Sequence, residues 1–573
     1  MNRFLTWINS WWPLLLLNGL FLGIGLYWLF LVPYNNAPDE NTHFKYSVEF
    51  ILTHHHLPVW GVDDLDRFRH ALSSYNQMPA LNYAVAAVAA HAAHTLFGIE
   101  HYHGARLASL AWGLIFINGL FLTIRTLIAR PLLSAMITAA FAFIPQVLFS
   151  FCYVNADAHA LGIAALLAYA LARFWKTPSN ATLIMVGLAG GLLFSSKYNF
   201  FIYAPFLAAG FVYLAYRGRL SWLTVFRVAL AVACGAILIS GFWYARNYWL
   251  YGTPMPLLLG EERLAQLGIL REVVPVNHGI SRASFLWLLQ QKFVATTFAS
   301  FFGLFGYLDV GFRPEVYFAL RIIIPALGIL FLIELLLARD RPAAIVALWL
   351  GILLLAVLGL HIWTCLCNDF QPQGRYLFAS LIPMAIFLGW VANRQRRLLK
   401  YALALMVVTG ALMVQAIMLF AQTYGEPLVF AVFWDGSQGA CFQHGQSCTC
   451  PVKGGAAISR AERGEKNRIR VSCTSDNIRN ITVLRVDFPK RILGRYRDFA
   501  LTFNTDGDKL CLSGTNLPHA QCTDMTCDPK LNAFDATGPN PSASFTLIAI
   551  PAPLQTITLD MAIERRRLRD PAF

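Results

Sequence analysis

The chain has 573 residues, of which 57% are hydrophobic and only 13% are charged. Because an ordinary soluble domain carries about 25% charged residues, this composition excludes a soluble globular protein, a disordered chain and a small disulfide-stapled fold. Together with a mean hydropathy of +0.52, it predicts a polytopic helical membrane protein.

The charged residues are concentrated in the last quarter of the sequence. Residues 424–573 hold 18 Lys and Arg and 15 Asp and Glu, whereas the much longer segment 1–423 holds 27 and 16. We therefore predict an all-α transmembrane domain over 1–423 and a small soluble domain over 424–573. The net charge of +14 comes mostly from loops that flank membrane spans, which is the usual topology signal, so nucleic acid is not an expected partner.

About 20 mostly apolar residues are needed to cross a bilayer, and the first such run extends from about Trp12 to Val32. It is too long for the core of a signal peptide and has no small-residue cleavage site, so we expect it to remain in the protein. Further spans, which bring the expected number to about 11, lie at about 105–125, 132–152, 158–174, 182–196, 199–216, 221–245, 317–338, 342–363, 376–392 and 401–423.

The loops between these spans predict the orientation. Short basic connections are expected in the cytoplasm together with the N-terminus; they hold Arg125, Arg130, Arg173, Lys176, Arg217, Arg219, Arg339, Arg341, Arg394, Arg396, Arg397 and Lys400. The long loops 33–104 and 246–316 carry carboxylates and histidines and are expected outside, as is the C-terminal domain. Two further apolar segments, 78–98 and 291–310, are interpreted as interfacial helices on the outer face.

The C-terminal domain is predicted to be rich in cysteine and in β-strands. Its seven cysteines indicate disulfides and an oxidising compartment, with a zinc site as the alternative; they are Cys441, Cys448, Cys450, Cys473, Cys511, Cys522 and Cys527. Runs of alternating β-branched residues, with a turn at Asp506-Gly507, predict a small β-sandwich; the runs are 481–488, 498–503, 542–550 and 554–563.

The first outer loop begins with two adjacent carboxylates, Asp39 and Glu40, followed closely by His43. Ionisable residues at a membrane boundary carry a desolvation cost and are therefore candidates for function. A carboxylate here could take a proton from an acceptor hydroxyl as a general base. The alternative is that Asp39 and Glu40 only cap a helix that begins near Asn41.

Other polar residues are predicted on the same face of the membrane; they are Asn155, Asp157, Lys197, Arg246, Asn247, Gln371, Arg375 and Tyr376. Lys197 and Arg375 suit a phosphate group, one as a point charge and the other as a bidentate fork. The alternative for a lone basic residue is that its side chain extends to the interface, as is common in membrane proteins.

No metal or nucleotide site is predicted. The histidines of the first loop, including the run His54-His55-His56, lack the spacing of a metal site, although a divalent cation held by Asp39 or Glu40 with a lipid phosphate stays open. The sequence contains no Walker A motif, GxSxG elbow or dinucleotide fingerprint. A substrate that is already activated through a lipid phosphate is therefore expected.

Several motifs in this order resemble a broad bacterial multi-pass family of the GT-C glycosyltransferase superfamily. They are APDENTHFKY, NADAHA, the lysine of SSKYNF, RNYWLYGTP and QPQGRYLFASLIP, and they cover roughly residues 10–420. The sequence DENTHF is also similar to the opening of the first outer loop in protein O-mannosyltransferases. It has one extra residue before His43, so the resemblance carries no catalytic role to that residue, which is expected only to line the cavity.

The resemblance implies a polyprenyl-phosphate-sugar donor used at the outer face of the bacterial inner membrane, and a glycan or lipid-linked acceptor. It implies that Asp39 is the catalytic carboxylate, with Glu40 as the second candidate. Lys197 and Arg375 correspond to phosphate-binding residues, while Asn155 and Asp157 line the same cavity. Single displacement would invert the anomeric configuration. The alternatives are a lipid-linked-sugar flippase or exporter and a non-catalytic envelope assembly subunit.

Overall fold

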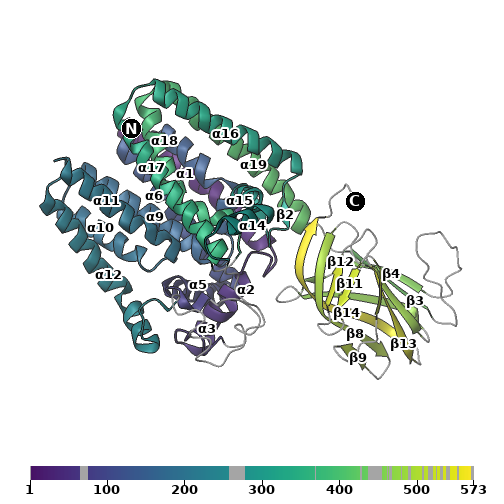
Figure 1. The fold of residues 1–573 in the computed structure, drawn as a ribbon. Helices are drawn as coiled ribbons and strands as arrows, with labels where there is room; N and C mark the ends of the chain where they lie inside the picture. The colour runs from purple at the N-terminus through teal and green to yellow at the C-terminus, as the bar shows by residue number, and fades with distance from the viewer. Residues whose placement is uncertain are drawn as a thin grey trace. The chain divides into compact units, whose positions relative to one another are not determined.

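The computed structural model describes residues 2–64, 75–256, 278–367 and 370–425 and twelve strands between Val429 and Leu568 (Figure 1). The chain divides into two compact units, which are described separately. One contains Met1–Phe30 and Asp39–Ile417, and the other contains Leu31–Pro38 and Met418–Phe573.

Nine helices in the described part of the chain are long and apolar enough to cross a membrane, so the chain is a multi-pass membrane protein. They contain α1 (Asn2–Leu31), α6 (His101–Ile128), α9 (Ala156–Lys176), η3 (Tyr198–Ile202) with α11 (Tyr203–Tyr216), α12 (Trp222–Tyr251), α16 (Pro314–Leu337), α17 (Arg341–Cys367), η5 (Gly374–Ser380) with α18 (Leu381–Arg394), and η6 (Arg396–Leu398) with α19 (Leu399–Gly425).

Two of the eleven predicted spans form shorter helices than expected. The segment 132–152 is divided into α7 (Pro131–Ala142) and α8 (Pro145–Ser150), because Pro145 has no amide hydrogen with which to continue α7. The segment 182–196 forms α10 (Asn180–Leu193), whose 14 residues rise about 21 Å, less than the ~30 Å of a hydrocarbon core.

The two segments interpreted as interfacial helices differ from each other in structure. Residues 78–98 contain α5 (Leu81–Phe97), which ends where Gly98 adopts a φ of 67°. Residues 291–310 are helical only over α15 (Phe293–Phe302), which follows α14 (Arg282–Gln290). The chain then forms a small hairpin of β1 (Leu304–Phe305) and β2 (Val310–Gly311).

Close packing of α10 against α12 depends on small residues. A Cβ atom added to Gly191 would lie 2.3 Å from the backbone of Gly235, and one added to Gly235 would lie 2.0 Å from the carbonyl oxygen of Gly187. Small residues four positions apart let the backbones of two membrane helices approach in this way. The turn that follows α10 carries Lys197.

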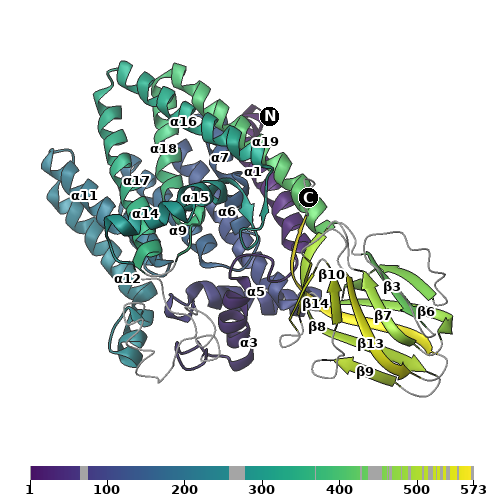
Figure 2. The ribbon, with the colours of Figure 1, turned by 45° about the vertical axis from the view of Figure 1, so that its right-hand side comes forward.

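Short helices follow α1 and lead into the candidate site. They are α2 (Glu40–His43), the π-helix η1 (Phe44–Glu49), α3 (Phe50–His54) and the 3₁₀-helix η2 (Tyr75–Gln77). In both ribbon views, α3 and α5 lie at one end of the bundle of long helices (Figures 1 and 2). The start of α9 and the turn before η3 also lie at this end.

The C-terminal residues form two antiparallel sheets. The strands are β3 (Val429–Asp435), β4 (Gly455–Arg460), β5 (Glu462–Arg463), β6 (Arg468–Ile478), β7 (Ile481–Asp487), β8 (Ile492–Thr505), β9 (Lys509–Ser513), β10 (Ala520–Thr523), β11 (Met525–Asp528), β12 (Ala533–Ala536), β13 (Ser542–Ile550) and β14 (Leu554–Leu568). One sheet has the order β10-β13-β7-β3-β4, and the other has β11-β12-β8-β14-β6-β5, with β9 beside β8. The predicted disulfides and zinc site involve side chains outside the described part, and the β-sandwich stays a prediction.

Candidate active site

Asp39 directs its side chain away from the helix that it precedes. It occupies the N-cap position of α2 with a φ of 61°, and its carboxylate makes no capping hydrogen bond. Instead, Oδ2 accepts a hydrogen bond from Nη2 of Arg375 at 2.7 Å. The left-handed backbone is unusual for a residue other than glycine, although Asp and Asn tolerate it best. The alternative in which Asp39 is only a helix cap is therefore wrong.

Arg375 is placed by a close contact between η5 and α15. The backbone amide of Gly374 donates to Oγ of Ser300 at 2.7 Å, and a Cβ atom on Gly374 would lie 2.3 Å from the backbone nitrogen of Phe301. Only glycine fits here without displacing one of the two backbones. The side chain of Arg375 is 4% exposed, against 24% for Asp39.

Asp157 and Lys197 form a second ion pair beside the first. Nζ of Lys197 donates to both carboxylate oxygens of Asp157 at 2.9 and 3.1 Å, and Nη1 of Arg375 lies 3.8 Å from Oδ2 of Asp157. The four side chains thus form a row, Asp39–Arg375–Asp157–Lys197, in which negative and positive charges alternate and sum to zero. We call this row the charge cluster.

Asn155 holds the turn that carries Asp157. Its Oδ1 caps α9 by accepting from the amide of Ala158 at 2.9 Å, and its Nδ2 donates to the carbonyl oxygens of Ser150 and Tyr153. These contacts use the amide side chain fully, and Asn155 is buried. Asn155 therefore holds the turn that carries Asp157, and its place in the cavity lining stays a prediction.

Aromatic rings surround the two cations. Nζ of Lys197 lies 4.9 Å from the ring centroid of Tyr376, and Cζ of Arg375 lies 5.9 Å from it. The Tyr376 hydroxyl donates to Oε1 of Gln371 at 2.7 Å, while the Tyr153 hydroxyl lies 3.5 Å from Nη1 of Arg375. Nε of Arg375 is buried and has no hydrogen-bond partner among the described residues. One donor of the guanidinium is thus left for another acceptor.

His43 lies in an aromatic stack next to Asp39. Its ring is 3.9 Å from that of Tyr75, and its Nδ1 shares a 2.8 Å hydrogen bond with the hydroxyl of Tyr83. Tyr75 also forms a side-chain hydrogen bond with Asp39. The aromatic stack therefore contacts Asp39 through Tyr75, and His43 contributes to the stack through packing.

The protonation states follow from burial and charge. Burial alone would raise the pKa of Asp39, but the Arg375 guanidinium holds it below the usual value. Burial lowers the pKa of His43 to about 3, against the opposing effect of Asp39. Burial likewise lowers the pKa of Lys197, although Asp157 counteracts it. At neutral pH, Asp39 is ionised and His43 is neutral.

Glu40 takes part in a separate, fully buried ion pair. Nε and Nη2 of Arg106 donate to its two carboxylate oxygens at 2.6 Å each, and both side chains are 0% exposed. Nη1 of Arg106 also donates to the carbonyl oxygen of Leu29 at 2.7 Å. The pair joins α2 to α1 and α6. Both oxygens of Glu40 are already engaged, which favours Asp39 over Glu40 as a base.

Arg246 and Asn247 have contacts elsewhere. Nη2 of Arg246 donates to the carbonyl oxygens of Leu57 and Pro58 at 3.2 and 2.9 Å. Nδ2 of Asn247 donates to the carbonyl oxygen of Pro254 at 3.3 Å. Both residues therefore fasten loops near the end of α12, and their contacts do not join them to the charge cluster.

Candidate metal ligands do not gather in the described part of the chain, where no group of three or more His, Cys, Asp or Glu is arranged to hold a metal ion. The run His54-His55-His56 is exposed, and Nδ1 of His54 contacts the carbonyl oxygen of Phe50 at 3.1 Å. A divalent cation held by Asp39 together with a lipid phosphate stays a proposal.

An apolar cavity of about 600 Å³ lies among α6, α9, α11, α17 and α18. It is lined at one end by Ala164, Tyr203 and Ile382. These residues follow Asp157, Lys197 and Arg375 by six or seven positions on the same three chain segments. The cavity therefore begins six or seven positions beyond the charged residues on these segments and extends toward Trp175 and Trp390 near their other end.

Two residues of this region were missed from the sequence alone. Arg106 interrupts the apolar run of α6, and a lone arginine in such a run requires a buried carboxylate partner, so it could have been found. Tyr75 has no such signal. It reaches Asp39 because Oγ of Ser47 donates to Asn76 at 2.8 Å and Asn76 donates to Asp64 at 2.9 Å, which ties η2 to η1.

No family model and no curated protein matches the chain. Among solved structures it is similar to ArnT from Cupriavidus metallidurans in the apo state, at 17% identity over 65% of this chain with a TM-score of 0.36, and spans 59% of the length of that protein. It is also similar to the oligosaccharyltransferase AglB from Archaeoglobus fulgidus (16% identity, 73% of this chain, 56% of that chain, TM-score 0.40) and to the arabinosyltransferase EmbB from Mycobacterium smegmatis (10%, 96%, 64%, 0.31).

With TM-scores of 0.31–0.40, the similarity does not bear on activity, substrate or partners.

Proposed function

We propose that the protein is a membrane glycosyltransferase that moves a sugar from a polyprenyl-phosphate donor to an acceptor hydroxyl. The observation that carries the proposal is the charge cluster, three of whose residues lie on chain segments that go on to line the apolar cavity. It offers a base, Asp39, and two buried cations, Lys197 and Arg375, within one row of contacts. In this proposal, the apolar cavity takes part of an isoprenoid tail, and the phosphate binds to the two cations.

Arg375 has the geometry to accept this phosphate. Its Nε is buried without a described hydrogen-bond partner, and a guanidinium binds phosphate best through two parallel donors. Lys197 reaches the same place as a point charge. Because the charge cluster is neutral, a singly charged phosphodiester can enter without meeting net repulsion.

The proposed reaction is a single displacement. Asp39 takes the proton of the acceptor hydroxyl as the oxygen attacks the anomeric carbon, and the bond from that carbon to the phosphate oxygen breaks. The bonding electrons leave with the phosphate, which changes from a diester with one negative charge to a monoester with two. Lys197 and Arg375 stabilise the added charge. The anomeric configuration is inverted.

Arg375 links the base to the leaving group in this scheme. Asp39 attracts Arg375 most strongly while its carboxylate is ionised, since a neutral carboxyl group is a weaker acceptor. When Asp39 gains the proton, its hold on Arg375 weakens at the moment when the phosphate gains charge. The guanidinium therefore shifts its strongest interaction from Asp39 to the phosphate as the reaction proceeds.

The remaining assignments extend this proposal. The basic turns are placed in the cytoplasm with the N-terminus, which puts the charge cluster on the outer face of the inner membrane. The strands from β3 to β14 then form a periplasmic, cysteine-rich domain, and the acceptor is a glycan or lipid-linked molecule of the cell envelope. Glu40 and Arg106 support the site as a structural pair.

Turnover of a panel of polyprenyl-phosphate sugars by the purified protein tests the proposal. Transfer is expected to release the lipid phosphate from one donor in the presence of acceptor glycan, with a defined anomeric product. A flippase would instead move a headgroup-labelled lipid across a vesicle membrane and leave it intact. Lipid transport without cleavage would contradict the proposal that the protein is a transferase. The same holds if Lys197→Met changes neither sugar transfer nor lipid transport.

A further inference from the structure

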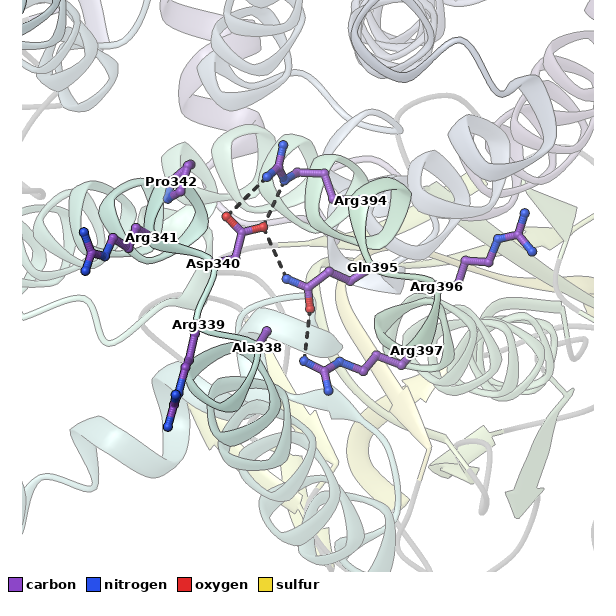
Figure 3. A pocket seen from close by; sticks show the side chains of 9 residues that line it. All are labelled: Ala338, Arg339, Asp340, Arg341, Pro342, Arg394, Gln395, Arg396 and Arg397. Carbon is purple, nitrogen blue, oxygen red and sulfur yellow. Dashed lines mark hydrogen bonds and ion pairs between the residues drawn. The ribbon is translucent and has the colours of Figure 1, made fainter.

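A second basic site lies at the far end of α18 from Arg375. The turn between α16 and α17 and the turn between α18 and η6 form a shallow, solvent-open depression of about 870 Å³, lined by residues 338–342 and 394–397 (Figure 3). Arg375 precedes α18 and Arg394 ends it. The candidate span from Gly374 to Arg394 therefore separates this depression, the arginine pocket, from the charge cluster.

The arginine pocket has a strong excess of positive charge. Its lining includes five arginines and one carboxylate, which leaves a net charge of +4. The residues come from turns that join four candidate spans, α16, α17, α18 and α19. Such turns lie at the level where lipid headgroups meet water.

Asp340 organises the arginine pocket from its centre. Its carboxylate accepts from Arg394 at 3.0 and 3.3 Å and from Gln395 at 3.3 Å, and it caps α17 through the amide of Ala343 at 3.2 Å. The Arg394 hydrogen bond, more than any other contact, lowers the pKa of Asp340. Gln395 in turn accepts from Arg397 at 3.5 Å. These contacts fix the two turns to each other and use the one negative charge.

Three guanidiniums are left on the rim. Arg339, Arg341 and Arg396 are exposed, and their side chains have no hydrogen bond or ion pair with another described residue. Figure 3 shows them extending outward around Asp340 from both turns. Arg339 begins from a left-handed backbone with a φ of 51°. The fold thus holds three guanidiniums around the ion pair of Asp340 with Arg394.

We propose that the arginine pocket binds the phosphate of an anionic phospholipid headgroup. Guanidiniums are well matched to phosphate oxygens, and clusters of basic residues next to spans attract anionic lipids. The position of the pocket at the ends of four spans favours a lipid over a soluble phosphate. The site lies on the membrane face opposite the charge cluster and is independent of the proposed transfer reaction.

The basic turn at Arg217 and Arg219 provides the matched control. It joins α11 to α12, and both arginines are exposed, but neither lines the arginine pocket. If positive charge at a membrane face were sufficient, neutralising this turn would weaken lipid binding as much as neutralising the rim. If the pocket is a site, only the rim variant should lose the lipid.

Retention of phosphatidylglycerol on the full-length protein tests the proposal. Native mass spectrometry would compare wild type, the double variant Arg341→Gln/Arg396→Gln and the control Arg217→Gln/Arg219→Gln, with phosphatidylcholine as the neutral lipid. Affinity for phosphatidylglycerol should fall by about fivefold for each guanidinium that contacts it, and the control should keep wild-type affinity. Asp340, Arg394 and Gln395 stay intact, so the two turns remain joined, and thermal melting checks the fold.

Three results would overturn the proposal. Equal losses in the two variants would show a general effect of charge, and unchanged retention in the rim variant would show that the rim does not bind the lipid. Displacement of the lipid by millimolar inorganic phosphate would assign the pocket to a soluble phosphate.

Discussion

Nη2 of Arg375 lies 2.7 Å from Oδ2 of Asp39, although the two residues are 336 positions apart in the chain. Both are needed in the proposed reaction, one for the phosphate and the other for the acceptor proton. Their contact makes each residue the partner of the other before substrate binds. In the proposed reaction, Asp39 therefore becomes free to accept a proton as Arg375 binds the phosphate instead.

The pH dependence should reveal this contact. The Arg375 guanidinium keeps the pKa of Asp39 below its usual value of 3.8, so the carboxylate is ionised at any pH above that value. The value of kcat/KM should therefore fall only at lower pH. The variant Arg375→Gln removes the cation, so its acidic limb should move to higher pH. Profiles of kcat/KM against pH measure both limbs, and coincident limbs would exclude the contact from the working enzyme.

No inflection near pH 6.5 is expected from His43, because burial lowers its pKa to about 3. A variant His43→Phe keeps the aromatic stack on Tyr75 and loses only the hydrogen bond with Tyr83. Its pH profile should keep the same shape as that of wild type. A shifted limb in this variant would instead assign a titrating role to His43.

Substitution of Lys197 should separate stability from donor binding. In Lys197→Met the carboxylate of Asp157, which is 1% exposed, loses its closest cation, and breaking such a buried pair costs about 3–5 kcal/mol. The double variant Lys197→Met/Asp157→Asn should regain most of this stability without regaining affinity for the donor. Thermal melting and the Kd for a polyprenyl phosphate measure the two effects. Recovery of affinity in the double variant would show that Lys197 serves only the fold.

Breaking the buried pair of Glu40 and Arg106 should lower stability and leave the activity of the folded protein nearly unchanged. Glu40→Gln leaves Arg106 with an uncompensated charge among groups that are 0% exposed, and a loss of about 3–5 kcal/mol is expected. Activity per folded molecule should change little, because both carboxylate oxygens are already bound to Arg106. Active-site titration corrects for the unfolded fraction. A loss of kcat in fully folded Glu40→Gln would make Glu40 a candidate for the catalytic base again.

Gly374 tests how closely Arg375 must be placed. In Gly374→Ala the new Cβ atom would lie 2.3 Å from the backbone of Phe301, so η5 has to move away from α15 and carry Arg375 with it. A displacement of about 1 Å can lower a rate by about a hundredfold, and we expect kcat/KM to fall by tenfold to a hundredfold. Gly351→Ala on α17, where nothing lies within 4 Å, is the control. Equal activity in the two variants would contradict the placement.

Topology alone predicted which end of the bundle holds Asp39, Asp157, Lys197 and Arg375, because short basic turns and polar loops alternate along the chain. The structure brings these four side chains together, while their roles stay proposals. The same reasoning placed Arg246 and Asn247 with them, but residues on one face need not share one site. Which cation pairs with which carboxylate could not be predicted, since it depends on contacts between segments far apart in sequence.

The long spans were predictable for a similar reason, since about 20 apolar residues are sufficient for a helix that crosses the bilayer. The shorter helices were not, because the effect of Pro145 on 132–152 depends on where the chain can bend. The hairpin after α15 was also missed. Gly306, with a φ of 61°, and the hydrogen bond from the amide of Tyr307 to Oδ1 of Asp309 at 2.9 Å form its turn, and the ring of Phe305 packs against Trp28 and Phe149.

The most direct test of the proposed chemistry is a single-turnover comparison of wild type with Asp39→Asn, using the donor that the lipid panel identifies. Asparagine tolerates the left-handed backbone at this position, so the variant should fold and still bind the donor. The proposed mechanism predicts that transfer falls by at least about 100-fold while donor affinity is retained. Transfer at the wild-type rate by folded Asp39→Asn would contradict the assignment of Asp39 as the base.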